Sequence, residues 1–327
     1  MMTPLRFEEM YEEEWTELEA LLDAVRGRKG SVPPPATVSG ARLAALYRRV
    51  CEHLALARAR FYPVHLIDRL ERLTGDAHQV IYYRRDFGIA RLREFVAADF
   101  PRAIRQHAAY VAAAAAAFVL PTVLIGCLVY WRPELILSVV SVEQAASIEQ
   151  MYSPAAHSIG RERSANSDWI MFGYYIRNNI GVAFQCFAGG LFAGIGSLFF
   201  LGYNGAFGGA VAGYLTERGL SSTFYSFVAT HAAFELTAIV LSGAAGLRVG
   251  FALLDPGRLT RAQALVVATR ESAVLLYGVT ALLLVAAAVE AFWSSATWLP
   301  HGVKYGVAGV CWVAVLAYCT FQGRRAD

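Results

Sequence analysis

Charged residues are scarce in this chain of 327 residues, and their scarcity excludes an ordinary soluble globular protein. Only 17% of the residues are charged and 56% are hydrophobic, and the mean hydropathy is +0.41. Several segments approach the ~20 apolar residues that a helix needs to cross a bilayer. The composition therefore predicts an all-α, multi-pass membrane protein with the lipid bilayer as its first partner.

Cysteine motifs and common catalytic motifs are missing as well. The five cysteines are odd in number and scattered without a CxxC pair, which indicates neither a disulfide framework nor a thiolate zinc site. The chain also has no Walker motif, no GxSxG elbow, no HExxH helix and no dinucleotide fingerprint between a strand and a helix. We therefore expect no catalytic residues, no metal, no cofactor and no enzymatic activity.

A cleavable signal peptide is a third feature that the sequence lacks. The first residues are acidic and contain no basic region followed by an apolar core, so we expect the N-terminus to stay in the cytoplasm. The net charge is only +3, but 17 of the 29 Lys and Arg residues lie in residues 1–107. This asymmetry predicts a membrane orientation rather than a nucleic-acid partner.

Residues 1–107 have the pattern of a helical cytoplasmic domain. Thr3 and Pro4 form a plausible helix start, and a glycine- and proline-rich linker is expected at about residues 30–40. Apolar residues then recur at spacings of three and four, which is typical of amphipathic helices. These residues are Leu43, Leu46, Tyr47, Val50, Leu54, Ala57 and Phe61, followed by Leu66, Leu70, Leu73, Ala77 and Val80.

Six arginines lie between residues 84 and 105, directly before the first apolar segment. Two interpretations are open for them. They could form the ordinary basic flank of a cytoplasmic domain, or they could form a dedicated lipid or partner site, because each basic group near anionic lipid adds ~1 kcal/mol of attraction.

The apolar segments in residues 108–327 predict a transmembrane domain. A polar loop is expected at residues 132–178, outside the cytoplasm. The predicted membrane segments are residues 108–130, 180–201, 205–215, 224–247, 273–292 and 303–321. A helix rises ~1.5 Å per residue, so the third segment is too short to cross a hydrocarbon core of ~30 Å by itself.

The arginines after the third segment determine how it should run. If that segment did not cross, the four arginines in residues 248–270 and the basic C-terminal tail would lie outside the cytoplasm. If it crosses, both return to the cytoplasm, as the positive-inside rule requires. The sequence therefore predicts a helical bundle of about six membrane segments, the third short, broken or tilted, with both termini cytoplasmic.

Half of the 28 glycines lie between residues 181 and 250. Spacings of four place some of them on one helix face, where helices can approach closely. Three interpretations are open: packing within the chain, homodimerisation, and a backbone that lines a permeation path. The glycines on these faces are Gly190, Gly194, Gly205, Gly209 and Gly213, together with Gly246 and Gly250.

His231 and Glu235 lie one turn apart within a predicted membrane helix, and Ser242 continues their polar stripe. A charged side chain in hydrocarbon costs at least ~2.5 kcal/mol, so such residues usually face a bundle interior or a cavity. The pair could be a structural hydrogen-bonded pair, a proton or ion relay, or part of a metal site. A third metal ligand is not evident nearby in the sequence.

Four amide side chains are further candidates for an intramembrane polar site. Asn178 and Asn179 are expected to enter the second segment, which also carries Gln185, and Asn204-Gly205 is expected to break the chain before the short third segment. Broken segments can form binding sites near the midplane of a membrane. Glu290 lies close to the predicted outer boundary, so we expect it to be interfacial.

The membrane half resembles the stage II sporulation protein M family. The resemblance rests on NNIGVAFQCFAGGLFAGIGSLFFLGYNGAFGGAVAGYL, residues 178–215, and on HAAFELTAIVLSGAAGLRVGFALL, residues 231–254. RFEEMYEEEW, ALARAR and RLTGDAHQVIYYRR in the N-terminal part are similar to the long branch of the family in Gram-negative bacteria that do not sporulate. Thr230 stands where the family often has proline, so we expect no proline kink before His231.

The resemblance implies a multi-pass protein of the bacterial cytoplasmic (inner) membrane. The sporulation member works with peptidoglycan-cleaving enzymes, and relatives in other bacteria often lie beside genes for a MoxR-type AAA ATPase. We therefore expect a membrane scaffold or assembly component with envelope or ATPase partners. We also expect a homo-oligomer, for which a dimer is one possibility, and no nucleic-acid partner. The alternative is a channel or transporter whose path passes His231 and Glu235.

Overall fold

The computed structural model describes residues 3–26, 40–82, 88–153, 168–296 and 298–324. Over these ranges the chain contains helices and no strand, which confirms the predicted all-α class. The chain divides into two compact units, Met1–Arg91 and Leu92–Asp327. The expected linker falls almost wholly on residues 30–39, outside the described residues.

The first unit consists of three helices, α1 (Pro4–Arg26), α2 (Gly40–Ala59) and α3 (Val64–Tyr82). α1 begins where expected, and the Phe7 amide donates to the Thr3 carbonyl. The apolar stripes of the three helices meet in one core, as is usual for amphipathic helices in water. Its buried members are Phe7, Trp15, Leu18, Leu22, Leu43, Leu46, Val50, Ala57, Tyr62, Leu66, Leu70, Leu73 and Ala77.

Phe61 departs from its predicted place in this core. It is 93% exposed and has a φ of 53°, a conformation that bulky residues rarely adopt. α2 ends at Ala59, and Pro63 disfavours helical backbone before it, so the chain turns at this point. Tyr62 is buried in the core instead.

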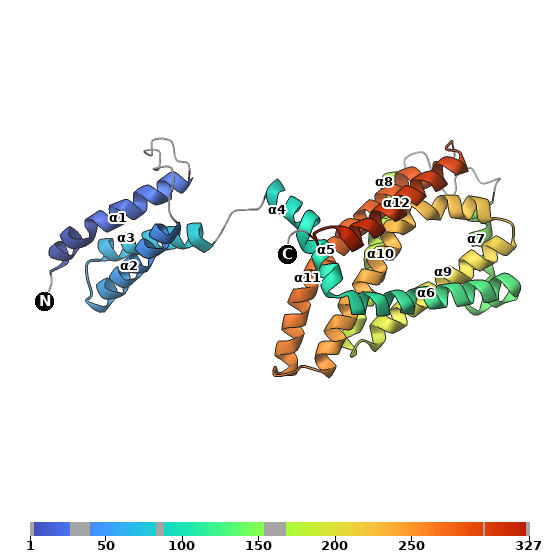
Figure 1. Cartoon of the computed structure of the whole chain (residues 1–327), viewed down its shortest axis with the longest axis horizontal. Coiled ribbons are helices and arrows are strands. Elements are labelled where there is room, and N and C mark those ends of the chain that lie inside the picture. Colours follow the sequence, from blue (N-terminus) through green and yellow to red (C-terminus); the bar gives the residue numbers. More distant parts are fainter. Residues whose placement is uncertain (1–2, 27–39, 83–87, 154–167, 297, 325–327) are drawn as a thin grey trace. The chain divides into compact units, whose positions relative to one another are not determined.

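The second unit begins with short helices and continues with long ones (Figure 1). The short elements before the first long helix are α4 (Ile89–Glu94), the π-helix η1 (Phe95–Asp99) and α5 (Phe100–Gln106). The long helices are α6 (Ala108–Trp131), α8 (Asp168–Ala188), α9 (Ile195–Glu217), α10 (Ser221–Leu254), α11 (Arg261–Ala288) and α12 (His301–Phe321). The π-helix η4 (Val289–Ser294) extends α11.

Two helix pairs dominate this unit. α6 and α9 run side by side, and α10 and α11 form a hairpin from which α12 returns along α10 (Figure 1). α8 packs against α10 and α11. The arrangement places α10 in the middle of the bundle, where most of its residues are buried.

Among the residues that the structure describes, five helices are long and apolar enough to cross a membrane: α6, α9, α10, α11 with η4, and α12. Two contacts join the two ends of this unit. The Arg105 guanidinium, before α6, donates to the Gln322 carbonyl, after α12, and the Tyr318 hydroxyl donates to the Val96 carbonyl over 2.6 Å. These contacts place the segment before α6 beside the segment after α12. α8, of 21 residues, is not among the five candidate helices.

The third membrane segment is neither short nor broken, so that prediction was wrong. α9 runs continuously through Asn204-Gly205, and the Asn204 amide donates within the helix to the Phe200 carbonyl over 2.7 Å. The chain turns earlier, at the 3-10 helix η3 (Gly189–Leu191) and at Gly194, whose φ is 84°. The predicted second segment, residues 180–201, therefore covers the end of α8, the turn and the start of α9.

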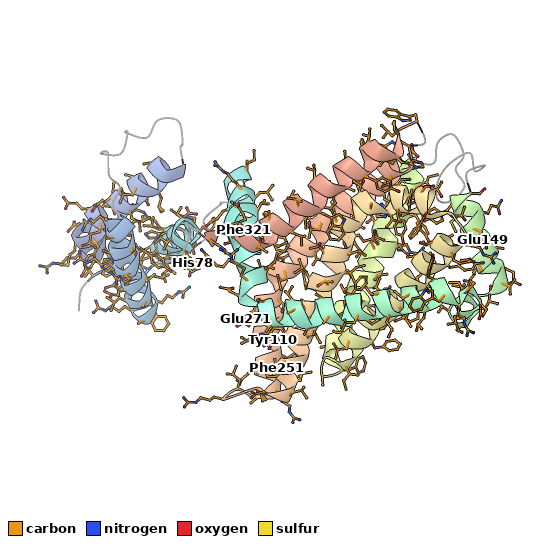
Figure 2. The ribbon with its side chains drawn as sticks, turned by 45° about the vertical axis from the view of Figure 1, so that its right-hand side comes forward. His78, Tyr110, Glu149, Phe251, Glu271 and Phe321 are labelled. Atoms are coloured by element: carbon orange, nitrogen blue, oxygen red, sulfur yellow. The ribbon has the colours of Figure 1, made fainter. Side chains whose placement is uncertain are left out.

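The expected polar loop 132–178 is partly folded. It contains the 3-10 helix η2 (Pro133–Ser138) and α7 (Val142–Tyr152), whose N-terminus is closed by a capping box of Ser141 and Gln144. Glu149, labelled in Figure 2, accepts a hydrogen bond of 2.5 Å from the Tyr214 hydroxyl and so ties α7 to α9. Residues 154–167 lie outside the described residues, and α8 begins at the end of the predicted loop.

Candidate functional site

His231 and Glu235 lie one turn apart on α10, as predicted. Only 5% of the surface of His231 is exposed, and its Nε2 lies 4.0 Å from Glu235 Oε2. That separation is longer than a hydrogen bond. The imidazole edge therefore faces the carboxylate across a gap within the bundle.

Glu290 joins this pair from the π-helix η4. One ligand atom from each of His231, Glu235 and Glu290 lies within 4.8 Å of the other two, and both carboxylates are only partly exposed. Glu290 therefore belongs to a polar cluster that the sequence did not indicate, and its interfacial position stays a prediction. Its closeness to the end of the helix in sequence did not reveal that η4 packs against α10.

Ser294 and Lys304 support the cluster from the same side. Ser294 Oγ lies 3.0 Å from His231 Nδ1, and the Lys304 ammonium donates to the Ser294 carbonyl over 2.7 Å. Lys304 is fully buried, although it belongs to the expected sixth span. A lysine one turn inside a span was a signal in the sequence, and our sequence interpretation did not use it.

Ser242 and the amide side chains serve other contacts. Ser242 Oγ donates to the Ala183 carbonyl on α8 over 2.6 Å, so it anchors a helix rather than extending the cluster. Asn178 Nδ2 donates to Asn179 Oδ1 over 3.0 Å within α8, not at its start, and Gln185 is exposed on the same helix. The Asn204 bond stays within α9.

The predicted glycine faces lie against other helices of the same chain. A Cβ added to Gly205, Gly209 or Gly213 would collide with the backbone of α6 at Phe118, Thr122 and Gly126, respectively. One added to Gly190 would collide with the Gly246 backbone, and one added to Gly250 would collide with the Gly194 backbone. These glycines let the helix backbones approach where side chains would hold them apart.

The cluster of His231, Glu235 and Glu290 offers one imidazole nitrogen and two carboxylates inside a helical bundle. Ionised carboxylates at this spacing repel each other strongly away from water, so a buried pair needs a proton, a cationic side chain or a bound cation. The arrangement can therefore take part in hydrogen bonding, proton exchange or cation binding. Intramembrane ionisable residues of this kind usually mark a functional site.

Comparison with known families agrees with this architecture. Residues 114–295, which hold all three residues of the cluster, match Stage II sporulation protein M. Residues 5–83, which make up the three helices of the first unit, match a domain of unknown function (DUF8413). No curated protein and no solved structure gives a significant match. The first match covers more than half of this chain, and the chain therefore belongs to the stage II sporulation protein M family.

Proposed function

We propose that this protein is an assembly component of the bacterial inner membrane, in which the membrane unit forms a scaffold and the N-terminal unit binds protein partners. The observation that carries the proposal is the separate core of residues 4–82. Trp15, Leu18, Leu46 and Leu70 are fully buried within that unit. A three-helix unit with a core of its own can present its surface to protein partners.

The charge on the first unit fits a soluble binding unit. Arg69 lies 2.8 Å from Glu12 and 3.3 Å from Glu19, and Arg42 pairs with Glu17 at 2.5 Å. Exposed ion pairs add little stability, but they keep the surface of the three helices highly polar. Such a surface suits reversible protein contacts in water better than burial in lipid.

The orientation belongs to the same proposal. The contact of Arg105 with Gln322 supports an arrangement with both ends of the membrane unit on one side. The basic residues before α6 favour the cytoplasm for that side under the positive-inside rule. The N-terminal unit would then face cytoplasmic partners such as a MoxR-type AAA ATPase, and α7 would face envelope partners. A homodimer would form through surfaces other than the glycine faces that pack against α6 and η3.

Affinity purification of the full chain at native expression, in mild detergent, tests this proposal. Other proteins should copurify with the full chain and be lost when residues 1–91 are deleted, while the membrane level of the remaining protein is unchanged. Recovery of this chain alone would contradict the proposal. A deletion that leaves the partners in place would move their binding to the membrane unit.

A channel or transporter is the second candidate, and it is favoured by the convergence of Glu290 on His231 and Glu235 inside the bundle. Proteoliposomes under a pH gradient and under a voltage gradient should then pass ions, and Glu290→Gln should slow the flux. Absence of flux under both gradients would remove this candidate.

A further inference from the structure

We propose that His231, Glu235 and Glu290 bind one divalent first-row transition-metal ion, with Zn²⁺ as the first choice. The sequence alone supplied two possible ligands on α10. The structure supplies a third from η4, with one ligand atom of each residue within 4.8 Å of the others. The proposal does not depend on the scaffold function.

The chemistry of the donors selects the class of ion. Imidazole nitrogen suits Zn²⁺, Fe²⁺ and Cu²⁺, whereas carboxylate oxygen also suits Mn²⁺ and Mg²⁺. A mixed set of one nitrogen and two oxygens fits Zn²⁺, which sites with three protein ligands commonly bind with a water in the fourth position. No thiol belongs to the cluster, so ions that require sulfur are disfavoured.

The distances fit a site that closes around an ion. With metal–ligand bonds of ~2.0–2.1 Å, neighbouring ligand atoms in a tetrahedral site lie about 3.3 Å apart. His231 Nε2 and Glu235 Oε2 lie 4.0 Å apart. Small rotations of the two side chains would bring them to the required distance.

Contacts on the far side of the ring already orient the imidazole. Ser294 Oγ lies 3.0 Å from His231 Nδ1, and Lys304 holds the Ser294 backbone through a bond of 2.7 Å to its carbonyl. The Phe227 ring packs edge-on against the imidazole, with ring centroids 5.4 Å apart. With Nδ1 engaged in this way, Nε2 faces Glu235, which is the division of roles found in metal-bound histidines.

The electrostatics also favour a cation. Glu235 and Glu290 together can carry two negative charges beside a buried imidazole, and carboxylates at this spacing repel each other. A divalent ion would neutralise both carboxylates. The π-helical form of η4, which is rare and frequent at functional sites, presents Glu290 and Ser294 to α10 one turn apart.

The test is metal stoichiometry of the full-length protein, purified in detergent with a tag that contains no histidine. After chelation, reloading with Zn²⁺ and removal of free ion, we expect one equivalent per chain. Glu235→Gln and Glu290→Gln keep the side-chain shape and should weaken binding at least ~10-fold, and Ser294→Ala should weaken it ~10-fold while the stoichiometry stays at one. Glu271→Gln is the matched control, because Glu271 lies on α11 and pairs with Arg248 at 2.7 Å (Figure 2).

Wild-type protein that holds far less than one Zn²⁺, or a Glu290→Gln variant that binds like wild type, would overturn the proposal. Size-exclusion profiles and thermal melting show whether each variant is folded. If Glu290→Gln does not fold, the visible absorption spectrum of Co²⁺ bound to the wild-type protein tests the proposal. Intense visible absorption from a four- or five-coordinate ion supports the site, and the absence of such bands overturns it.

Discussion

Different interactions stabilise the interior of each of the two units of this chain. The first unit buries large side chains, including Trp15 and Phe7, and its exposed faces carry Arg–Glu pairs. The membrane unit brings helix backbones together at glycines and buries serine, threonine, histidine and lysine side chains. The hydrophobic effect drives packing in water but hardly between helices in lipid, where close packing and polar contacts replace it.

The largest expected effect concerns the core of the first unit. Trp15→Ala removes a fully buried ring and its hydrogen bond of 3.1 Å to His53, and we expect a loss of about 3–5 kcal/mol in that unit. Limited proteolysis of the full chain should then cut within residues 4–82 much faster. Leu5→Ala, at an exposed position, is the control and should change the cleavage rate little.

The second prediction concerns glycine packing in the membrane unit. Gly209→Ala places a Cβ against the Thr122 backbone, and we expect a loss of about 3 kcal/mol, because backbone atoms cannot move aside as a flexible side chain can. Melting in detergent measures the effect. Gly208→Ala is the matched control, since a Cβ at Gly208 meets nothing within 4 Å; equal melting of the two variants would contradict the packing account.

The third prediction concerns the surface of the first unit. Arg69 pairs with Glu12 and Glu19 and lies over the Trp15 ring at 5.5 Å, and its guanidinium lowers the pKa of Glu12. Arg69→Met should cost only about 1 kcal/mol in chemical denaturation of that unit. Arg72→Met, on an exposed position of the same helix, should cost less. A loss as large as that of Trp15→Ala would mean that ion pairs, not the apolar core, hold the unit together.

The smallest effect is a dependence on pH. Burial lowers the pKa of His53 below its usual value, and its neutral Nδ1 accepts the Trp15 hydrogen bond. The unfolded state therefore binds a proton more readily, so this contribution is present above about pH 6.5 and is lost as the pH falls through the lowered pKa. Denaturation of the unit at pH 7.5 and pH 5.5 should show a modest decrease in stability, which His53→Gln should largely remove.

Periodicity and composition predicted much of this molecule and failed at specific places. Apart from Phe61, the apolar stripes from Leu43 to Ala77 lie in the core or pack against it, because amphipathic spacing directly encodes a buried face. The chain break predicted at Asn204-Gly205 was wrong, because the same dipeptide suits a tight turn in water and close helix packing in a membrane. The sequence did not indicate the turn at Gly194, because many other glycines lie in the same segment.

The candidate site was only half predictable. His231 and Glu235 share a helix face by simple spacing, so the sequence indicated them. Glu290, Ser294 and Lys304 come from η4 and α12, and only the tertiary packing of these elements on α10 brings them to His231. Local sequence carries no signal for such a meeting beyond the presence of ionisable residues inside predicted spans.

We expect the cluster of His231, Glu235 and Glu290 to carry function, whereas the glycine contacts build the fold. The most direct test is complementation of a deletion strain, for growth or resistance to envelope stress, by His231→Gln, Glu235→Gln and Glu290→Gln at matched membrane levels, with detergent melting measured in parallel. We expect well-folded, well-inserted variants that fail to complement. Full complementation, or failure only where the protein unfolds, would contradict the claim and make the cluster a structural contact.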